Sequence, residues 1–118
     1  MDGASVPVTV GGGEAGSRIQ VQVSADGQVA TIKVQGRFDC HLQQEFRQAY
    51  ESAGLGRTRL FLVDLAAVPY VDSAACGMLL VFRDLALAQA SEVRLVGVQP
   101  VVRRIFNLLQ FQNLFRMD

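Results

Sequence analysis

A run of apolar residues at positions 60–65, interrupted only by Asp64, limits most strongly how this chain can fold. The run has the length of a β-strand, and a strand that is apolar on both faces needs other elements to cover both. Such strands lie in the middle of sheets whose parallel strands are joined by helices. We therefore expect an α/β fold with residues 60–65 in the centre of the sheet.

Segments on either side of this run have the patterns of further strands and helices. Residues 19–23 and 29–34 alternate apolar with polar side chains around an Ala-Asp-Gly turn, which predicts a β-hairpin. Residues 93–98 repeat the buried-strand pattern. Helical spacing predicts helices over residues 40–53 and 73–89 and a last helix that begins at Pro100. The predicted fold is a mixed four-stranded sheet with helices packed against it.

The apolar residues at helical spacing define a predicted buried face for each helix. The expected inward-facing residues are Leu42, Phe46, Ala49 and Ala53 in the first helix, Ala75, Leu79, Phe82 and Ala86 in the second, and Val101, Ile105, Leu108 and Leu109 in the third. Residues 111–115 are expected to cap the core. Residues 1–17 are rich in glycine and predict a flexible leader, so the folded domain is expected over residues 18–118.

Charge and hydropathy exclude several classes of function. Eleven Lys and Arg residues balance eleven Asp and Glu residues, so there is no net field to attract nucleic acid or an anionic membrane. No apolar stretch is long enough to span a bilayer, and no secretory signal pattern is present, which predicts a cytoplasmic protein without direct membrane insertion.

The two cysteines and the single histidine predict no metal site and no cofactor. Cys40 and Cys76 do not form a CxxC pair, and His41 adds one further ligand at most. Both cysteines are interpreted as reduced thiols, with Cys76 packing as a small apolar residue on its helix. A redox role would require an exposed thiolate whose pKa is lowered.

Two segments follow strands at the predicted carboxyl edge of the sheet, where ligands and partners of parallel sheets usually bind. One is Gly36-Arg37-Phe38-Asp39, and the other is residues 71–77. Asp39 is a candidate N-cap, and Ser73 lies at or next to the N-cap of its helix. Ser73 is either a helix cap alone or a hydroxyl open to phosphorylation, whose added charge the helix dipole would favour and nearby carboxylates would repel.

The motif around Ser73 resembles the signature of STAS domains, the family of bacterial anti-sigma factor antagonists. The resemblance rests on Val-Asp-Leu at positions 63–65 and on Val-Asp-Ser-Ala-Ala-Cys-Gly-Met-Leu-Leu at positions 71–80. Residues 36–39 are similar to the family's G-x-hydrophobic-D element. Residues 96–98, 101–106 and 114–115 are similar to its closing strand and helix, so the resemblance covers residues 18–118.

This resemblance implies a phosphoprotein that binds an anti-sigma factor of the serine-kinase type and so releases a sigma factor. Ser73 stands at the phosphoacceptor position, and a serine phosphatase would reset it. ATP and Mg²⁺ would belong to the kinase. Ala74 and Ala75 replace the common second hydroxyl and glycine, which leaves Ser73 as the single phosphoacceptor of the motif. The implied partner-binding residues are Gly36, Arg37, Phe38, Asp39, Asp72, Ser73, Ala74 and Gly77.

The sequence leaves two other functions and one question of oligomeric state to consider. Some proteins of this fold are small subunits of ABC-type lipid transport complexes and bind the ATPase without a phospho-switch. An enzyme with Ser73 as nucleophile, His41 as base and Asp39 or Asp72 as orienting group is disfavoured, because the G-x-S-x-G elbow is absent and the histidine starts a different helix. A homodimer through the edge of the hairpin is left open.

Overall fold

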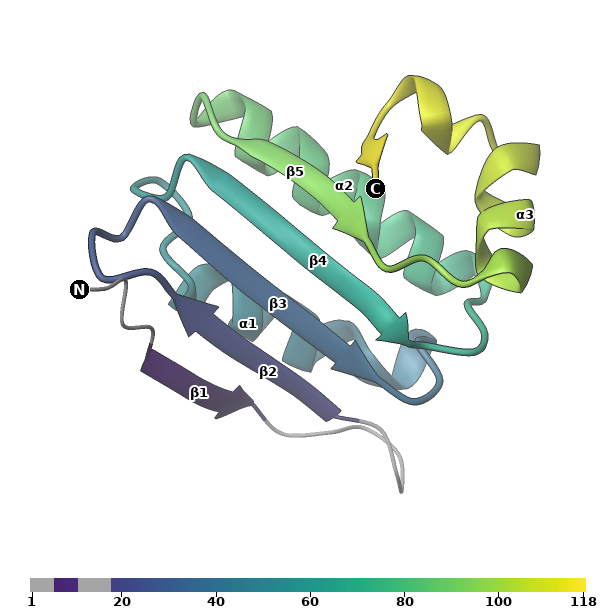
Figure 1. Cartoon of the computed structure of the whole chain (residues 1–118), viewed down its shortest axis with the longest axis horizontal. Coiled ribbons are helices and arrows are strands. Elements are labelled where there is room, and N and C mark those ends of the chain that lie inside the picture. Colours follow the sequence, from purple (N-terminus) through teal and green to yellow (C-terminus); the bar gives the residue numbers. More distant parts are fainter. Residues whose placement is uncertain (1–5, 11–17) are drawn as a thin grey trace.

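The computed structural model of the protein describes residues 6–10 and 18–118, and in these residues six strands form one mixed sheet (Figure 1). The elements are β1 Val6–Val10, β2 Arg18–Val23, β3 Val29–Gln35, the 3-10 helix η1 Cys40–Leu42, α1 Gln43–Ser52, β4 Leu60–Ala67, α2 Ser73–Ala88, β5 Glu92–Val96, α3 Pro100–Leu108, the 3-10 helix η2 Phe111–Asn113 and β6 Arg116–Met117. The α/β fold and the order of its central elements are as predicted.

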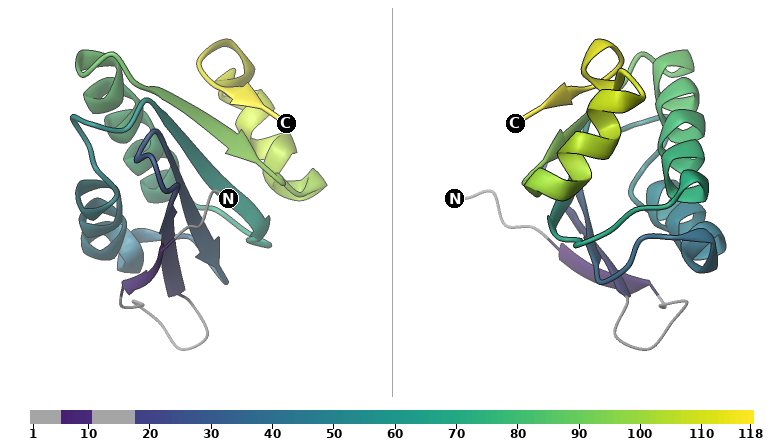
Figure 2. Two further views of the ribbon diagram at one scale, coloured as in Figure 1. Left: turned by 60° about the vertical axis from the view of Figure 1, so that its left-hand side comes forward. Right: turned by 90° about the vertical axis from the view of Figure 1, so that its right-hand side faces the viewer.

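The strands are arranged in the sheet in the same order as in the chain. The β1–β2 and β2–β3 pairs are antiparallel, whereas β3–β4, β4–β5 and β5–β6 are parallel. Figure 2 shows α1 and α2 together on one face of the sheet, with α3 and the C-terminal segment on the other side. The sequence therefore predicted correctly that the parallel connections lie in the second half of the domain.

Strand β4 occupies the centre of the sheet, with hydrogen-bonded neighbours on both edges. Phe61, Val63 and Leu65 point into the core and are inaccessible to solvent, while Leu62 and Asp64 on the other face are half-buried. The buried faces predicted for the first two helices are confirmed: their apolar residues meet β4 on one side of the sheet.

Aromatic rings join α1 and α2 to the sheet. The Phe82 ring stacks on Tyr50 at 4.5 Å and meets Phe61 and Phe46 edge-on at 5.0 Å and 5.7 Å between ring centroids. Phe46 also contacts Phe38, at 5.2 Å. Burial of these rings fixes the two helices side by side against the sheet.

The sheet has two strands more than predicted. Val6–Val10 pair antiparallel with β2, although they lie within the predicted flexible leader. Their alternating valines suit a strand, and the unpaired edge of β2 supplies hydrogen-bond partners that sequence patterning does not reveal. The rest of that leader, residues 1–5 and 11–17, lies outside the described residues. The second addition is β6, which pairs with β5.

The predicted inner face of α3 is wrong by one residue. Val102 and Phe106 are inaccessible to solvent, whereas Val101 is 57% and Leu108 is 81% exposed. Leu109 is also exposed and Ile105 is half-buried. Two neighbouring stripes of this helix are apolar, and packing against the core chooses between them. The choice buries Phe106, whose ring stacks on Phe111 at 4.9 Å. The predicted capping of the core by residues 111–115 is confirmed by the burial of Phe111 and Phe115.

Candidate functional site

The two segments expected at the carboxyl edge of the sheet lie side by side. Phe38 forms an isolated parallel bridge with Val71. The Phe38 backbone N–H donates to the Tyr70 carbonyl at 3.2 Å, and the Asp72 N–H donates to the Phe38 carbonyl at 3.4 Å. Backbone hydrogen bonds therefore hold the start of η1 next to the start of α2, as the parallel topology predicted.

Two adjacent residues, Asp72 and Ser73, have different roles at the start of helix α2. Asp72 is the N-cap, and its carboxylate accepts a hydrogen bond from the Ala75 N–H at 2.8 Å. Ser73 is the first residue of the helix and is exposed to solvent. The capping residue of this helix is therefore Asp72 rather than Ser73.

Asp39 caps η1 in the same way at the other segment. Its carboxylate accepts from the His41 backbone N–H at 3.0 Å and lies 3.1 Å from the His41 ring Nδ1. Arg37 Nε lies 3.4 Å from the second carboxylate oxygen. The backbone hydrogen bond from His41 is the main cause that lowers the pKa of Asp39 below its usual value. The Arg37 guanidinium also stacks over the Tyr70 ring, 4.9 Å from its centroid.

A groove separates the η1–α1 segment from α2. Its α2 wall consists of Ala74, Gly77, Met78 and Val81, and its other wall comes from η1 and α1. A Cβ atom built on Gly77 would meet nothing within 4 Å, so this part of the groove is open. Ser73 lies one turn before Gly77 on the helix, and residues four apart share a face. Ser73 is exposed and lies next to the groove, although it is not one of the residues that line it.

The structure brings the eight predicted contact residues into one region but exposes them unequally. Arg37 and Ser73 are exposed, whereas Gly36, Asp72, Ala74 and Gly77 are half-buried and Asp39 is buried at 6% exposure. Phe38 is inaccessible to solvent and packs on Phe46. Its side chain is therefore part of the core, and it is the Phe38 backbone that joins the two segments.

Sequence reasoning missed the contribution of α1 to the groove. Gln44 and Arg47 line it from that helix, together with Cys40 and His41 of η1. These residues belong to the polar face that a periodicity argument assigns to solvent. Only the packing of α1 beside α2 turns part of that face into a groove wall.

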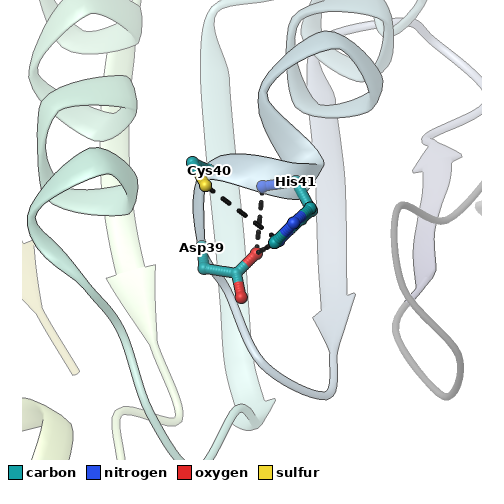
Figure 3. Close-up of side chains that lie close together, drawn as sticks. All are labelled: Asp39, Cys40 and His41. Atoms are coloured by element: carbon teal, nitrogen blue, oxygen red, sulfur yellow. Dashed lines mark hydrogen bonds and ion pairs between the residues drawn. The ribbon is translucent and has the colours of Figure 1, made fainter.

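His41 interacts with its neighbours on the same turn. Its Nδ1 atom lies 3.1 Å from the Asp39 carboxylate and 4.0 Å from the Cys40 sulfur (Figure 3). The orienting carboxylate of a catalytic triad contacts this same ring nitrogen, and here the Asp39 carboxylate also accepts from the His41 backbone N–H as the cap of η1.

The two cysteines differ in environment, as the sequence suggested for Cys76. Cys76 is buried on α2, and burial, followed by the charge of Asp72, raises the pKa of its thiol to about 11. Cys40 is exposed, and together with Asp39 and His41 it forms a group whose potential ligand atoms all lie within 4.8 Å of one another. The sequence-based prediction of no metal site considered only cysteine and histidine and did not include Asp39, and it stays a prediction.

Comparison with known proteins identifies the family. The sequence pattern of the STAS domain matches residues 20–118. The chain belongs to the STAS domain family. A STAS-domain containing protein of Pseudomonas aeruginosa is 44% identical over 95 residues, which cover 80% of this chain and 93% of that protein. Members of the family are in general binding proteins rather than enzymes.

Solved STAS structures share the fold at low sequence identity. The anti-sigma factor antagonist SpoIIAA in its unphosphorylated form superimposes with a TM-score of 0.64 and 19% identity over 85% of this chain and 86% of that one. The phosphorylated form of SpoIIAA from Bacillus has a TM-score of 0.66 and 18% identity over 85% and 90%. A sulfate transporter family protein from Wolinella succinogenes has a TM-score of 0.68 and 16% identity over 75% of each chain.

The STAS fold thus occurs both in anti-sigma factor antagonists and in transport proteins. Among the helices of residues 18–118, none is both long and apolar enough to cross a membrane.

Proposed function

We propose that this STAS protein is an anti-sigma factor antagonist controlled by phosphorylation of Ser73. In this proposal the unphosphorylated form binds an anti-sigma factor that is also a serine kinase, and binding releases a sigma factor. The observation that carries the proposal is the exposure of Ser73 at the first position of α2, where Asp72 already provides the N-cap. The hydroxyl is open to a phosphotransfer enzyme.

Phosphorylation at this position would act on docking rather than on the fold. A phosphate adds a charge of about −1.5 to −2, and the N–H groups at the start of a helix tolerate such a charge. The cap hydrogen bond from Ala75 to Asp72 does not involve the Ser73 hydroxyl, so it need not break. A kinase surface docked over Ser73 would instead have to desolvate the phosphate beside the Asp72 carboxylate, which weakens binding.

The contact surface in this proposal consists of the exposed parts of the two joined segments and the mouth of the groove. Arg37 provides a cation held between Asp39 and Tyr70. Gly77 leaves room for a partner side chain. The protein itself needs no cofactor, because the kinase would bring ATP and Mg²⁺ and a separate serine phosphatase would reset Ser73. Such a partner switch operates in the cytoplasm.

Phosphotransfer and binding should be tested together with the anti-sigma serine kinase from the same organism. The kinase and ATP should add one phosphate to the wild type, which peptide mass mapping places on Ser73. The Ser73→Ala variant should remain unmodified and keep its affinity for the kinase. Ser52 is another exposed serine at a helix end. Ser52→Ala is therefore the matched control and should behave as the wild type.

Two results would contradict the proposal. One is phosphate on another residue with Ser73 unmodified. The other is equal kinase affinity for the phosphorylated and unphosphorylated protein, since the switch requires a difference.

The structural similarity to a sulfate transporter family protein supports a second candidate function. In that case the chain would be a small STAS subunit of a transport complex, of the ABC-type lipid transporter kind, and would bind the ATPase without a phospho-switch. Co-purification with an ATPase, unaffected by Ser73→Asp, would support this function. Loss of an anti-sigma partner on Ser73→Asp would support the antagonist instead.

A further inference from the structure

Three different metal-ligating side chains lie on one turn at the start of η1. The carboxylate of Asp39, the thiol of Cys40 and the imidazole of His41 come from consecutive residues, and their ligand atoms all lie within 4.8 Å (Figure 3). His41 Nδ1 is 3.1 Å from Asp39 Oδ1 and 4.0 Å from Cys40 Sγ. Among the described residues, this group combines sulfur, nitrogen and oxygen donors at short range.

One of the three donor side chains, Asp39, is held in place, whereas those of Cys40 and His41 can move. Asp39 is buried, caps η1 and follows Phe38, whose backbone is bonded to the α2 segment. Cys40 is exposed, and the His41 side chain is 55% exposed. A fixed carboxylate with two adjustable partners allows small changes in distance at little cost in packing.

Two of the three distances between ligand atoms are close to those of a tetrahedral zinc site. Zinc bonds of about 2.3 Å to sulfur and about 2.0–2.2 Å to nitrogen and oxygen hold the ligand atoms about 3.4–3.6 Å apart. The Asp39–His41 pair, at 3.1 Å, would have to open slightly, and the Cys40–His41 pair, at 4.0 Å, would have to close by a similar amount. The Asp39–Cys40 pair, which lies within 4.8 Å, would have to close as well, and rotation of the exposed Cys40 and His41 side chains would supply these changes.

We propose that Asp39, Cys40 and His41 form a binding site for a divalent transition metal of borderline softness, with Zn²⁺ as the expected ion. This donor set suits zinc better than Mg²⁺ or Ca²⁺, which prefer oxygen ligands. On binding, the thiol loses its proton to solvent and the imidazole nitrogen that faces the ion must also be unprotonated. The site is independent of the proposed phosphorylation of Ser73.

The positive charge of Arg37, next to the site, is expected to lower its affinity for a metal ion. Arg37 Nε lies 3.4 Å from Asp39 Oδ2 and competes with a cation for the carboxylate. Three protein ligands also leave a fourth tetrahedral position open. Cys40 and His41 line the groove, so that position is accessible to water or to a ligand from a bound partner.

The tag-free, reduced full chain should be titrated with Co²⁺, which reports thiolate ligation through a charge-transfer band in the near ultraviolet, and then with competing Zn²⁺. We expect one equivalent to bind. Cys40→Ser should abolish the band, and His41→Gln should weaken binding at least about tenfold, because even the loss of an outer hydrogen-bond partner commonly costs that much. Cys76→Ser is the matched control, because its thiol is buried on α2, and it should keep the band.

Two further variants separate ligation from folding. Asp39→Asn keeps an N-capping side chain and removes the charge, so it should weaken Co²⁺ binding while thermal unfolding shows an intact domain. Arg37→Gln removes the competing cation and should raise the affinity by about twofold to fivefold, the range typical of an exposed charge pair. A wild-type spectrum without the thiolate band would overturn the proposal. A band that survives Cys40→Ser or disappears in Cys76→Ser would overturn it as well.

Discussion

Replacement of Gly77 by alanine should stabilise the protein and weaken partner binding at the same time. Gly77 lies inside α2, where glycine costs about 0.5–1 kcal/mol relative to alanine. A Cβ at this position meets nothing within 4 Å, so no clash offsets the gain. Unfolding of a chain of 118 residues has an entropy of about 0.2–0.25 kcal/mol/K, which converts the gain into a rise in Tm of about 2–5 °C.

The same methyl group would occupy the wall of the groove. If the kinase docks there, a surface that fits against the Gly77 backbone has to shift. Overpacking of this kind costs about 1–3 kcal/mol, which is about fivefold to 150-fold in Kd. Function, rather than packing, would then explain why a glycine stands in the middle of this helix.

Thermal unfolding followed by circular dichroism would measure the first effect, and fluorescence anisotropy with the labelled anti-sigma kinase the second. Asp84→Ala is the matched control, since Asp84 is an exposed residue of α2 that does not line the groove. It should leave kinase affinity unchanged. A stabilised Gly77→Ala protein with unchanged affinity would refute the groove as a docking surface. A fall in Tm would refute the open geometry around Gly77.

Three other properties can be predicted from the structure. The pKa of Asp39 is lowered by its backbone hydrogen bond, so its stabilising effect is complete above the unfolded-state pKa of about 4 and is lost as pH falls through the folded-state value. Acid unfolding of Asp39→Asn should therefore depend less on pH than that of the wild type. Ellman's reagent should label Cys40 rapidly in the folded protein, whereas Cys76, with a pKa raised to about 11, should react only on unfolding. Phe106→Ala should destabilise the protein by about 3–5 kcal/mol in urea denaturation, whereas Leu108→Ala should change stability by less than about 0.5 kcal/mol. Similar losses for the two variants would contradict the observed packing of α3.

The location of the site was largely predictable from the sequence. Asp39 and Asp72 precede helical patterns, and both cap the helices that follow them. The two segments follow strands that are parallel neighbours, which places them at one edge of the sheet. The capping residues and the order of the parallel strands can both be predicted from short stretches of sequence. The location of these two segments could therefore be predicted without the structure.

The composition of the site surface was less predictable. Phe38 belongs to a motif expected to bind a partner, yet its ring is in the core. Arg47 was not expected at the site, yet it lines the groove. The outcome in each case depends on which neighbouring element covers a side chain, and residues distant in sequence supply that element.

The sequence pattern by itself determined those helices and strands that have only one possible buried face. The apolar run of β4 had to be central, and the stripe of α1 offered a single face to the sheet. Helix α2 is apolar on more than one side, because Val81, Leu85 and Leu87 are exposed, so packing also chose its buried face. Tertiary packing decided the cases where local patterns left two solutions. The adjacent apolar pairs of α3 allowed two buried faces, and stacking of Phe106 on Phe111 selects one. Likewise, Val6–Val10 became a strand because β2 has a free edge beside them. Contacts with residues distant in sequence contribute to the free energy of folding, and a short stretch of sequence does not contain them. Their effect can therefore be seen only in the folded structure.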